Sequence, residues 1–346
     1  MVSQVKVAVH GSYFADNYGD TLLVKLMCDM AAGIVGRENV YLAVPGHPRE
    51  QQSIGYPVLS ASERHTVTHL IYGGGGYLGE RTGKFWDSLS WSVRNYRRHL
   101  SWRSQFSLAK SAVVGTGFGP ISNRLLRIQV RRLLNDASVV LLRDQESLSF
   151  AREYGIKHPN MDRCVDIALS LPLRSGTREG IAIHIDNLSD SELQLVLGTL
   201  VSIHGLNAHI EAVFDNPASQ TPAAIAKYQS AAKSAGLTNF SVHKYINFEE
   251  LVDRVSHYAL IITSKLHVGI TCIAQGGSVI SIPTHQKTIR LYRQLGIPDF
   301  CIPRDGLTQE RLRHAVLSTE KFLPDREVIS DGMKKVRDAV VSFLRS

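Results

Sequence analysis

Short apolar runs alternate with helical patterns along most of this sequence. In the first half the runs cover residues 5–9, 40–44, 70–72, 112–115, 139–142 and 165–171. In the second half they cover residues 181–185, 208–214, 240–242, 260–262 and 279–282. Strands that alternate with helices favour layered α/β folds with mainly parallel sheets. The predicted fold class is therefore α/β.

The length and one polar segment predict two domains. A chain of 346 residues exceeds the usual size of a single domain. The segment 172–177, PLRSGT, is the predicted linker, which gives an N-terminal domain of residues 1–172 and a C-terminal domain of residues 178–330. Residues 331–346 carry a helical pattern of apolar positions and form a predicted final helix.

One strand–helix–strand unit carries polar side chains at both of its strand ends. The runs at 260–262 and 279–282 flank a helical pattern that extends to Ala274, and a polar segment follows each run. Because such strands are parallel, both polar segments lie at the same edge of the sheet. Ser264 can cap the helix, whose N-terminal N–H groups favour an anion. The predicted anion site contains Ser264, Lys265, His267, His285 and Lys287.

Polar and glycine-rich loops follow predicted strands in the first half. Asp16, Asn17 and Asp20 follow the first strand, where Asp20 or Thr21 is the predicted helix cap and the other polar groups can hold sugar hydroxyls. The loop at 73–76 is four glycines, including Gly74 and Gly75, and lacks the GxGxxG spacing of dinucleotide sites. Tight packing and close approach of a ligand both explain such glycines, here and in the loop at 115–120.

Two further residues have both a structural and a functional interpretation. Arg143, at the end of a strand, either forms a buried ion pair, with Asp166 as a candidate partner, or holds a phosphate or carboxylate in a bidentate manner. His184, beside Asp186, is either a hydrogen-bonded strand histidine or part of a site.

Taken in order, these motifs resemble the polysaccharide pyruvyl transferase family. The matching segments are Gly19-Asp20, the glycine loops at 73–76 and 115–120, Arg143-Asp144 with Ser147, Asp166-Ile167-Ala168, and Ser264-Lys265-Leu266-His267 with Lys287 and Leu295-Gly296. One departure is Lys265, where the family usually has Arg. Lysine keeps the charge but lacks the bidentate fork of a guanidinium.

The resemblance implies two Rossmann-like domains that face a cleft, as in GT-B glycosyltransferases, with the final helix returning to the first domain. It implies transfer of pyruvate from phosphoenolpyruvate onto two hydroxyls of a sugar, in a polysaccharide repeat unit or its lipid-linked precursor. No cofactor or metal is expected. A histidine suits proton transfer near neutral pH.

The implied roles divide between the two domains. His267 is the expected proton donor, and Asp16 or Asp20 the expected base. The expected donor-binding residues are Ser264, Lys265, His285, Lys287 and Arg143, and the expected acceptor-binding residues are Asn17, Gly74 and Gly75.

Two alternatives stay open at this point. A sugar-nucleotide-dependent glycosyltransferase of GT-B architecture would use the same helix N-terminus to hold a nucleoside diphosphate. A noncatalytic polysaccharide- or membrane-binding protein would bind without turnover. Release of phosphate, release of nucleoside diphosphate, or no turnover distinguishes the three functions.

Charge and composition add a candidate location. The formal net charge of +8 favours an anionic partner, and two arginine-rich segments carry much of it: Arg94, Arg97, Arg98 and Arg103, then Arg124, Arg127, Arg131 and Arg132. They form either a solvated surface or a contact with an acidic membrane or lipid diphosphate. No nucleic-acid-binding motif is present. The sequence shows neither a signal peptide nor a membrane-spanning segment. Its four scattered cysteines are expected to be buried thiols. We therefore expect a cytoplasmic protein that is peripheral at the inner face of the membrane.

Overall fold

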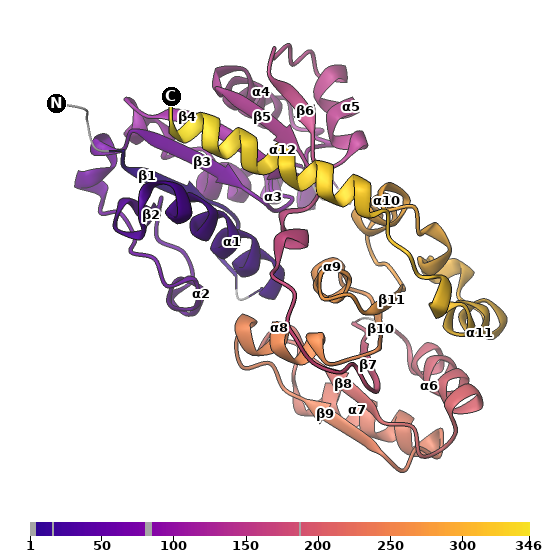
Figure 1. Cartoon of the computed structure of the whole chain (residues 1–346). Coiled ribbons are helices and arrows are strands. Elements are labelled where there is room, and N and C mark those ends of the chain that lie inside the picture. Colours follow the sequence, from indigo (N-terminus) through magenta and orange to yellow (C-terminus); the bar gives the residue numbers. More distant parts are fainter. Residues whose placement is uncertain (1–4, 16, 80–84, 187) are drawn as a thin grey trace. The chain divides into compact units, whose positions relative to one another are not determined.

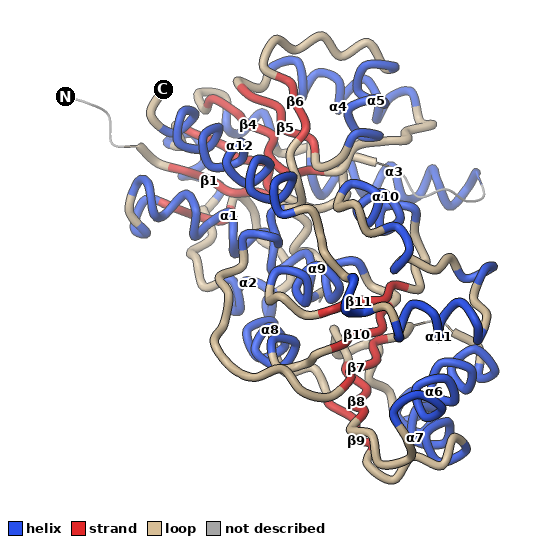
Figure 2. The backbone as a smooth tube through the Cα atoms, turned by 45° about the vertical axis from the view of Figure 1, so that its right-hand side comes forward, coloured by secondary structure: helices blue, strands red, loops and turns tan. Residues whose placement is uncertain are grey.

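The computed structural model describes residues 5–15, 17–79, 85–186 and 188–346, with the backbone alone for residues 85–88. The chain forms two compact units, Met1–Ile167 together with Ile329–Ser346, and Ala168–Val328. Each unit contains one parallel sheet with helices packed on it, as the tube in Figure 2 shows. The predicted α/β class with parallel sheets is therefore confirmed.

The sheet of the first unit has six strands in the order β2-β1-β3-β4-β5-β6. Their bounds are β1 Val7–His10, β2 Val40–Leu42, β3 His69–Gly73, β4 Lys110–Thr116, β5 Val139–Leu142 and β6 Met161–Arg163. All pairings are parallel. After β1 the chain adds β2 on one side of it, and it then adds β3 on the other side of β1. The β1–β3 pair is therefore the switch point of this sheet, where α/β proteins place their ligands.

Helices cover both faces of this sheet. They are α1 Tyr18–Val35, α2 Pro48–Ile54, α3 Phe85–His99, α4 Arg124–Asp136, α5 Gln145–Glu153 and α12 Arg326–Leu344. In Figure 1, α1 and the yellow α12 pass in front of the sheet and α3 lies behind it. Because β3, β4, β5 and β6 follow one another in one direction and such crossovers are right-handed, α3, α4 and α5 share a face.

The last helix belongs to the first unit through a regular apolar stripe. Gly332, Val336, Val340 and Phe343 are buried at spacings of three or four residues, the period of one helix face. The ring of Phe343 lies 5.0 Å from that of His69 in β3. The helix begins at Arg326, five residues before the apolar pattern that predicted it.

Two predicted features of the chain differ from the structure. Residues 165–171 form no strand but contain a short 3-10 helix, Ile167–Ser170. The sixth strand is Met161–Arg163, an edge strand with two exposed polar residues, so no apolar run marks it. The predicted linker at 172–177 lies inside the second unit, where the buried Gln275 bonds to both Arg174 N–H and the Pro172 carbonyl.

The second unit repeats this design with a five-stranded sheet in the order β11-β10-β7-β8-β9. The strands are β7 Ile181–His184, β8 Ile210–Val213, β9 Phe240–His243, β10 Leu260–Thr263 and β11 Ser278–Ser281, all parallel. The helices are α6 Asp190–His204, α7 Pro222–Ser234, α8 Phe248–Ser256, α9 Leu266–Ala274, α10 Gln286–Gln294 and α11 Gln309–Leu317. Here the switch point is the β7–β10 pair.

Other short 3-10 helices connect these elements, at Arg37–Asn39, Ala61–Thr66, Arg103–Phe106, Pro298–Phe300, Arg304–Gly306 and Thr319–Lys321. All four cysteines are buried and unpaired thiols, as predicted. Within the described ranges, no helix has both the length and the apolar composition needed to cross a bilayer.

A buried histidine pair joins β1 to α3. His10 Nε2 lies 2.9 Å from His99 Nδ1, and aromatic rings of Tyr72, Tyr77 and Trp102 surround the pair. One nitrogen must donate and the other accept, so the two rings cannot both be protonated while this hydrogen bond is formed. Burial lowers the pKa of His99 to about 3, with a further contribution from Arg98, and burial also lowers the pKa of His10 well below its ordinary value.

We expect this pair to make the fold sensitive to mild acid. Histidines in the unfolded chain take up protons below about pH 6.5, while the folded pair does not. Its contribution is therefore complete above that pH and is lost as the pH falls. At about pH 5 each histidine should reduce the free energy of unfolding by roughly 2 kcal/mol. Urea unfolding of wild type and of His99→Gln between about pH 7.5 and pH 5 measures this, and the variant should show the smaller pH dependence. Equal dependence in His99→Gln and in the exposed control His65→Gln would contradict it.

Candidate active site

Four ionisable side chains meet at the carboxyl edge of the second sheet. His184 ends β7, Asp186 follows it, Asp215 follows β8, and Lys265 follows β10. These three strands are neighbours, and β7 and β10 form the switch point. The parallel topology therefore brings together residues that are far apart in sequence.

Asp215 is the centre of this group. One of its carboxylate oxygens lies 3.3 Å from His184 Nε2 and accepts a hydrogen bond from the Asn216 amide. The other lies 3.5 Å from Lys265 Nζ, which is also 2.9 Å from Asp186 Oδ2. Asp215 and His184 are buried, whereas the Lys265 side chain keeps 32% of its surface exposed. Lys265 is thus the solvent-facing member.

The charges of this group are mutually stabilised. Burial alone would raise the pKa of Asp215, but His184, Lys265 and Asn216 together hold it well below its ordinary value. Burial alone would lower the pKa of Lys265, but Asp215 and Asp186 raise it overall. Asp215 is therefore a carboxylate and Lys265 an ammonium at neutral pH.

The carboxylates also form a geometry that a metal ion could use. His184, Asp186 and Asp215 bring ligand atoms within 4.8 Å of one another. The Lys265 ammonium, however, contacts the same two carboxylates. A divalent ion at this position would have to displace Lys265, so the residues fit an internal ion pair better than a metal centre.

The predicted helix α9 begins where expected, but Ser264 does not cap it. Lys265 is the N-cap residue, and its side chain does not cap α9. Ser264 Oγ instead accepts a hydrogen bond from the Asp186 N–H at 2.8 Å and joins the β7 and β10 strand ends. The prediction for Ser264 as a cap was wrong, because its hydroxyl is drawn to the neighbouring strand end.

His267 lies in the first turn of α9 and is half-buried, as the pattern predicted. His285 is the N-cap residue of α10, and Lys287 lies in the first turn of that helix. The His285 side chain does not cap α10 either. Since Thr263 pairs with Ser281 in parallel register, both helices start at the same edge of the sheet. The structure therefore places all five predicted anion-site residues along this edge.

The first unit places the candidate acceptor residues at its own switch point. Asn17 caps α1 by accepting the N–H groups of Gly19 and Asp20, at 3.0 and 3.3 Å. The prediction of Asp20 or Thr21 as the cap was wrong because α1 starts earlier, at Tyr18. Asp20 lies in the first turn, and Asp16 falls outside the described residues.

The loop at 73–76 combines close packing with one open position. Gly74 and Gly75 adopt positive φ angles of 54° and 81°, which side chains rarely accept. A Cβ atom at Gly74 would lie 2.7 Å from Leu23, whereas one at the exposed Gly76 would meet nothing within 4 Å. Packing thus explains Gly74, and the space at Gly76 is open to a ligand.

Arg143 and its neighbours hold the second glycine loop, residues 115–120, in place through polar contacts. The Arg143 guanidinium lies 3.2 Å from Asp166, which confirms the candidate partner, and 3.8 Å from Asp144. Asp144 caps α5 by accepting the Ser147 N–H, and Ser147 Oγ accepts the Phe118 N–H. The structure thus shows the buried ion pair; a donor-binding role for Arg143 stays a prediction, and this residue belongs to the first unit.

Asp186 and Asp215 were not predicted as site residues. Both stand directly after apolar runs, at 181–185 and 208–214, in the same position that identified Lys265. A search for polar residues after each apolar run, which identified Lys265, would therefore also have identified Asp186 and Asp215. His184, for which two interpretations were open, lies 3.4 Å from Thr263 Oγ1 through Nδ1 and is also part of the group through its contact with Asp215.

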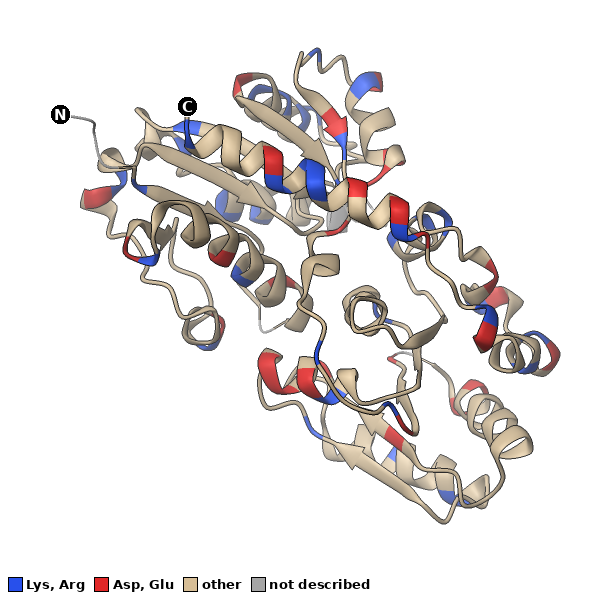
Figure 3. Cartoon of the chain, in the orientation of Figure 1, with Lys and Arg blue, Asp and Glu red and all other residues tan. Residues whose placement is uncertain are grey.

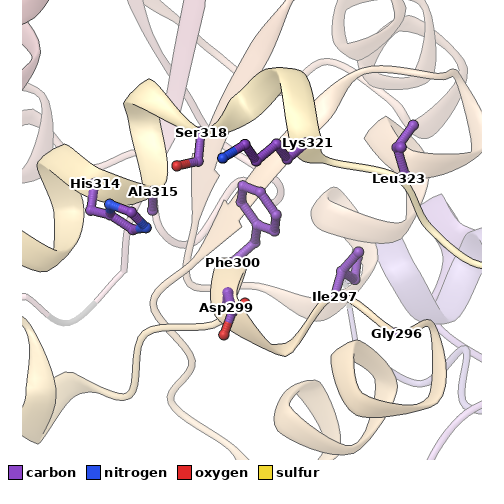
Figure 4. Close-up of a pocket in the computed structure, with 9 residues that line it drawn as sticks. All are labelled: Gly296, Ile297, Asp299, Phe300, His314, Ala315, Ser318, Lys321 and Leu323. Atoms are coloured by element: carbon purple, nitrogen blue, oxygen red, sulfur yellow. The ribbon is translucent and has the colours of Figure 1, made fainter.

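A shallow pocket of about 300 Å³ lies elsewhere in the second unit (Figure 4). Asp299, Phe300, His314 and Lys321 are among its lining residues. None of the predicted site residues lines it, so the candidate site is the sheet edge.

The family model of the polysaccharide pyruvyl transferases matches residues 17–286. This segment includes Asn17 and the glycine loop at 73–76 of the first unit, and the group around Lys265 of the second unit. The chain belongs to the polysaccharide pyruvyl transferase family. Membership identifies the protein as an enzyme and removes the noncatalytic alternative. No curated protein matches the sequence.

Solved structures are similar to this family member in fold. UDP-GlcNAc 2-epimerase from Neisseria meningitidis, bound to UDP-GlcNAc, has a TM-score of 0.60 at 8% identity, covering 98% of this chain and 99% of that chain. A glycosyltransferase from Rickettsia africae has a TM-score of 0.54 at 11% identity, with coverage of 100% and 97%. UDP-GlcNAc 2-epimerase from Methanocaldococcus jannaschii has a TM-score of 0.53 at 9% identity, with coverage of 94% and 97%. The fold is therefore GT-B-like.

We expect Lys265→Met to destabilise the enzyme, because it leaves Asp215 buried beside Asp186 without the ammonium. The loss should lie between the about 1 kcal/mol of an exposed pair and the about 3–5 kcal/mol of a fully buried one. Lys265→Arg retains the charge and should cost less. Urea unfolding at neutral pH measures both, with Lys233→Met as an exposed control. A Lys265→Met protein as stable as this control would show that the ammonium does not stabilise Asp215.

Proposed function

We propose that this enzyme transfers the enolpyruvyl carbons of phosphoenolpyruvate onto two hydroxyls of a sugar. The product is a cyclic ketal, and phosphate is released. The observation that carries this proposal is the family match over residues 17–286, which includes the edge of the second sheet. The acceptor is a polysaccharide repeat unit or its lipid-linked precursor, used in the cytoplasm at the inner face of the membrane.

The donor carries a phosphate and a carboxylate, so it requires hydrogen-bond donors and positive charge. The N-termini of α9 and α10 direct their backbone N–H groups and the positive ends of two helix dipoles to one edge, and neither N-cap side chain caps its helix. Lys287 and His285 add side chains there. We place the donor on this unit, with its anionic groups at the two helix ends.

Lys265 contributes differently from the arginine that is usual in the family. Its ammonium is held between Asp186 and Asp215, so part of its charge is already balanced. One exposed N–H direction remains for a donor oxygen, and the two carboxylates fix where it points. An Arg at this position would instead offer a planar fork.

The chemical steps need a proton and a base. The methylene carbon of the enol phosphate takes a proton, and an oxocarbenium-like centre forms at the adjacent carbon. A sugar hydroxyl adds to that centre and gives its proton to the base, and the C–O bond to phosphate breaks. A second hydroxyl then adds to the same carbon, loses its proton and closes the ring. We assign the proton to His267 in the first turn of α9, and the base to Asp20 or Asp16. Asn17, Gly74 and Gly75 would position the acceptor, with the open space at Gly76 beside them.

A sugar-nucleotide-dependent glycosyltransferase is the second candidate. The similar solved structures include a glycosyltransferase and an epimerase bound to UDP-GlcNAc. This similarity concerns the fold, and a helix N-terminus can hold a nucleoside diphosphate as well as a phosphate. The leaving group distinguishes the two reactions.

The test supplies the protein with phosphoenolpyruvate or UDP-GlcNAc, each with a panel of oligosaccharide repeat units. We expect phosphate release that depends on both phosphoenolpyruvate and an acceptor, together with an acceptor mass increase equal to one pyruvate less water. Release of UDP without release of phosphate would replace this proposal with glycosyl transfer.

We expect His267→Gln to lower turnover by about two to four orders of magnitude, the usual loss when a general acid is removed. His314→Gln, at an exposed position in α11, is the matched control and should remain active. Thermal melting of both variants verifies that the fold is retained. Near-normal turnover by a folded His267→Gln protein would exclude an essential role in proton transfer.

A further inference from the structure

Apolar side chains are exposed on two neighbouring helices of the first unit. Leu89, Val93 and Tyr96 of α3 are exposed, and so are Leu125 and Ile128 of α4, where Leu125 keeps 75% of its surface accessible. In the described part of the chain, the only other α-helix with a large exposed apolar residue is α11, with Leu317. The exposure is therefore concentrated rather than scattered.

Both sets follow the period of one helix face. Leu89, Val93 and Tyr96 are spaced by four and three residues, so they form one stripe along α3. On α4, Ile128 lies between Arg124 and Arg131 on one face, with Leu125 and Arg132 at its border. The opposite face of α4 buries Leu126, Val130, Leu133 and Leu134. Both helices thus carry large apolar side chains on the side that faces solvent.

The arginines on these helices divide into two groups. Three of the eight in the two segments serve the fold: Arg98 lies over the Phe14 ring, Arg103 pairs with Asp136, and Arg127 bonds to the Ile121 carbonyl and stacks on Tyr154. The remaining five, Arg94, Arg97, Arg124, Arg131 and Arg132, are exposed and form no ion pair among the described residues. Of the eight arginines that were expected to contact a ligand, these five are therefore the ones that remain available to it.

Each helix has one acidic residue, Asp87 in the first turn of α3 and Asp136 at the end of α4. Because Asp136 forms an ion pair with Arg103, that arginine already balances the charge of Asp136. Since α3 and α4 lie on the same face of the first sheet, we name their exposed sides together the α3–α4 surface. Figure 3 shows the blue segments of these helices.

We propose that the α3–α4 surface docks on an acidic lipid membrane. Its apolar side chains enter the boundary between headgroups and acyl chains, and its five free arginines contact lipid phosphates. A solvated surface would not need exposed leucine, valine and isoleucine, and a nucleic acid would match the arginines but not the aliphatic side chains. A lipid surface satisfies both. The proposal does not depend on which donor the enzyme uses.

The first test is co-sedimentation of the whole protein with two kinds of vesicle, phosphatidylcholine alone and phosphatidylcholine mixed equally with phosphatidylglycerol. We expect binding to the mixed vesicles that weakens as salt rises, since the Debye length shrinks to about 3 Å at molar ionic strength. Equal binding to both vesicles, or to neither, would overturn the proposal.

Two variants separate the contributions of charge and apolar contact. Arg124→Gln/Arg131→Gln/Arg132→Gln should lose on the order of a hundredfold in affinity for the mixed vesicles, about fivefold for each arginine. Leu89→Ser/Val93→Ser/Tyr96→Ser should also weaken binding while leaving its salt dependence in place. All six side chains are exposed, and thermal melting checks that both variants fold.

The matched control is Arg293→Gln/Arg326→Gln/Arg337→Gln, which removes the same charge from exposed positions elsewhere. It should lose much less affinity. An equal loss in the control would show attraction by net charge alone and overturn a specific surface. Loss in the arginine variant with unchanged binding in the α3 variant would indicate a polyanion ligand instead. A change of oligomeric state in the α3 variant without a change in vesicle binding would indicate a second copy of the chain.

Discussion

The parallel direction of the strands is the constraint on which this molecule depends. In each sheet every strand ends at the same edge, so whatever residue follows one strand lies near the residues that follow its neighbours. His184, Asp215 and Lys265 come from positions far apart in the chain and still form one hydrogen-bonded and ion-paired group. In the first unit, Asn17 follows β1 and the loop at 73–76 follows β3, so the parallel β1–β3 pair places both at one sheet edge in the same way.

The balance of charge at the second sheet edge changes how an anion would be held there. A lysine counted alone suggests an excess of positive charge, but Asp186 and Asp215 both contact its ammonium. A larger share of the attraction for a ligand would then fall to the backbone N–H groups at the starts of α9 and α10, where the N-cap side chains of Lys265 and His285 do not cap the helices. Backbone donors are fixed by the helices themselves and do not need a flexible side chain to be ordered.

Much of the fold could be predicted because apolar runs mark buried strands and their helices. The two exceptions have different causes, since the first lacks such a run and the second has one. The Met161–Arg163 strand is at an exposed edge, and the 165–171 run is buried without pairing as a strand. In the site, Lys265, His267 and Lys287 could be placed by strand and helix ends, whereas the hydrogen bond chosen by Ser264 could not. Hydroxyls accept from whichever N–H lies nearest, and that depends on the neighbouring strand rather than on local sequence.

The position of α12 determines when the first unit can be completed during synthesis. Residues 168–328 form a unit of their own, and most of the helix that packs on the first sheet is made after this unit. On the ribosome, the face of β3 that Phe343 covers stays without its helix while the entire second unit emerges. The second unit is therefore able to finish folding first, although it is translated later than most of the first.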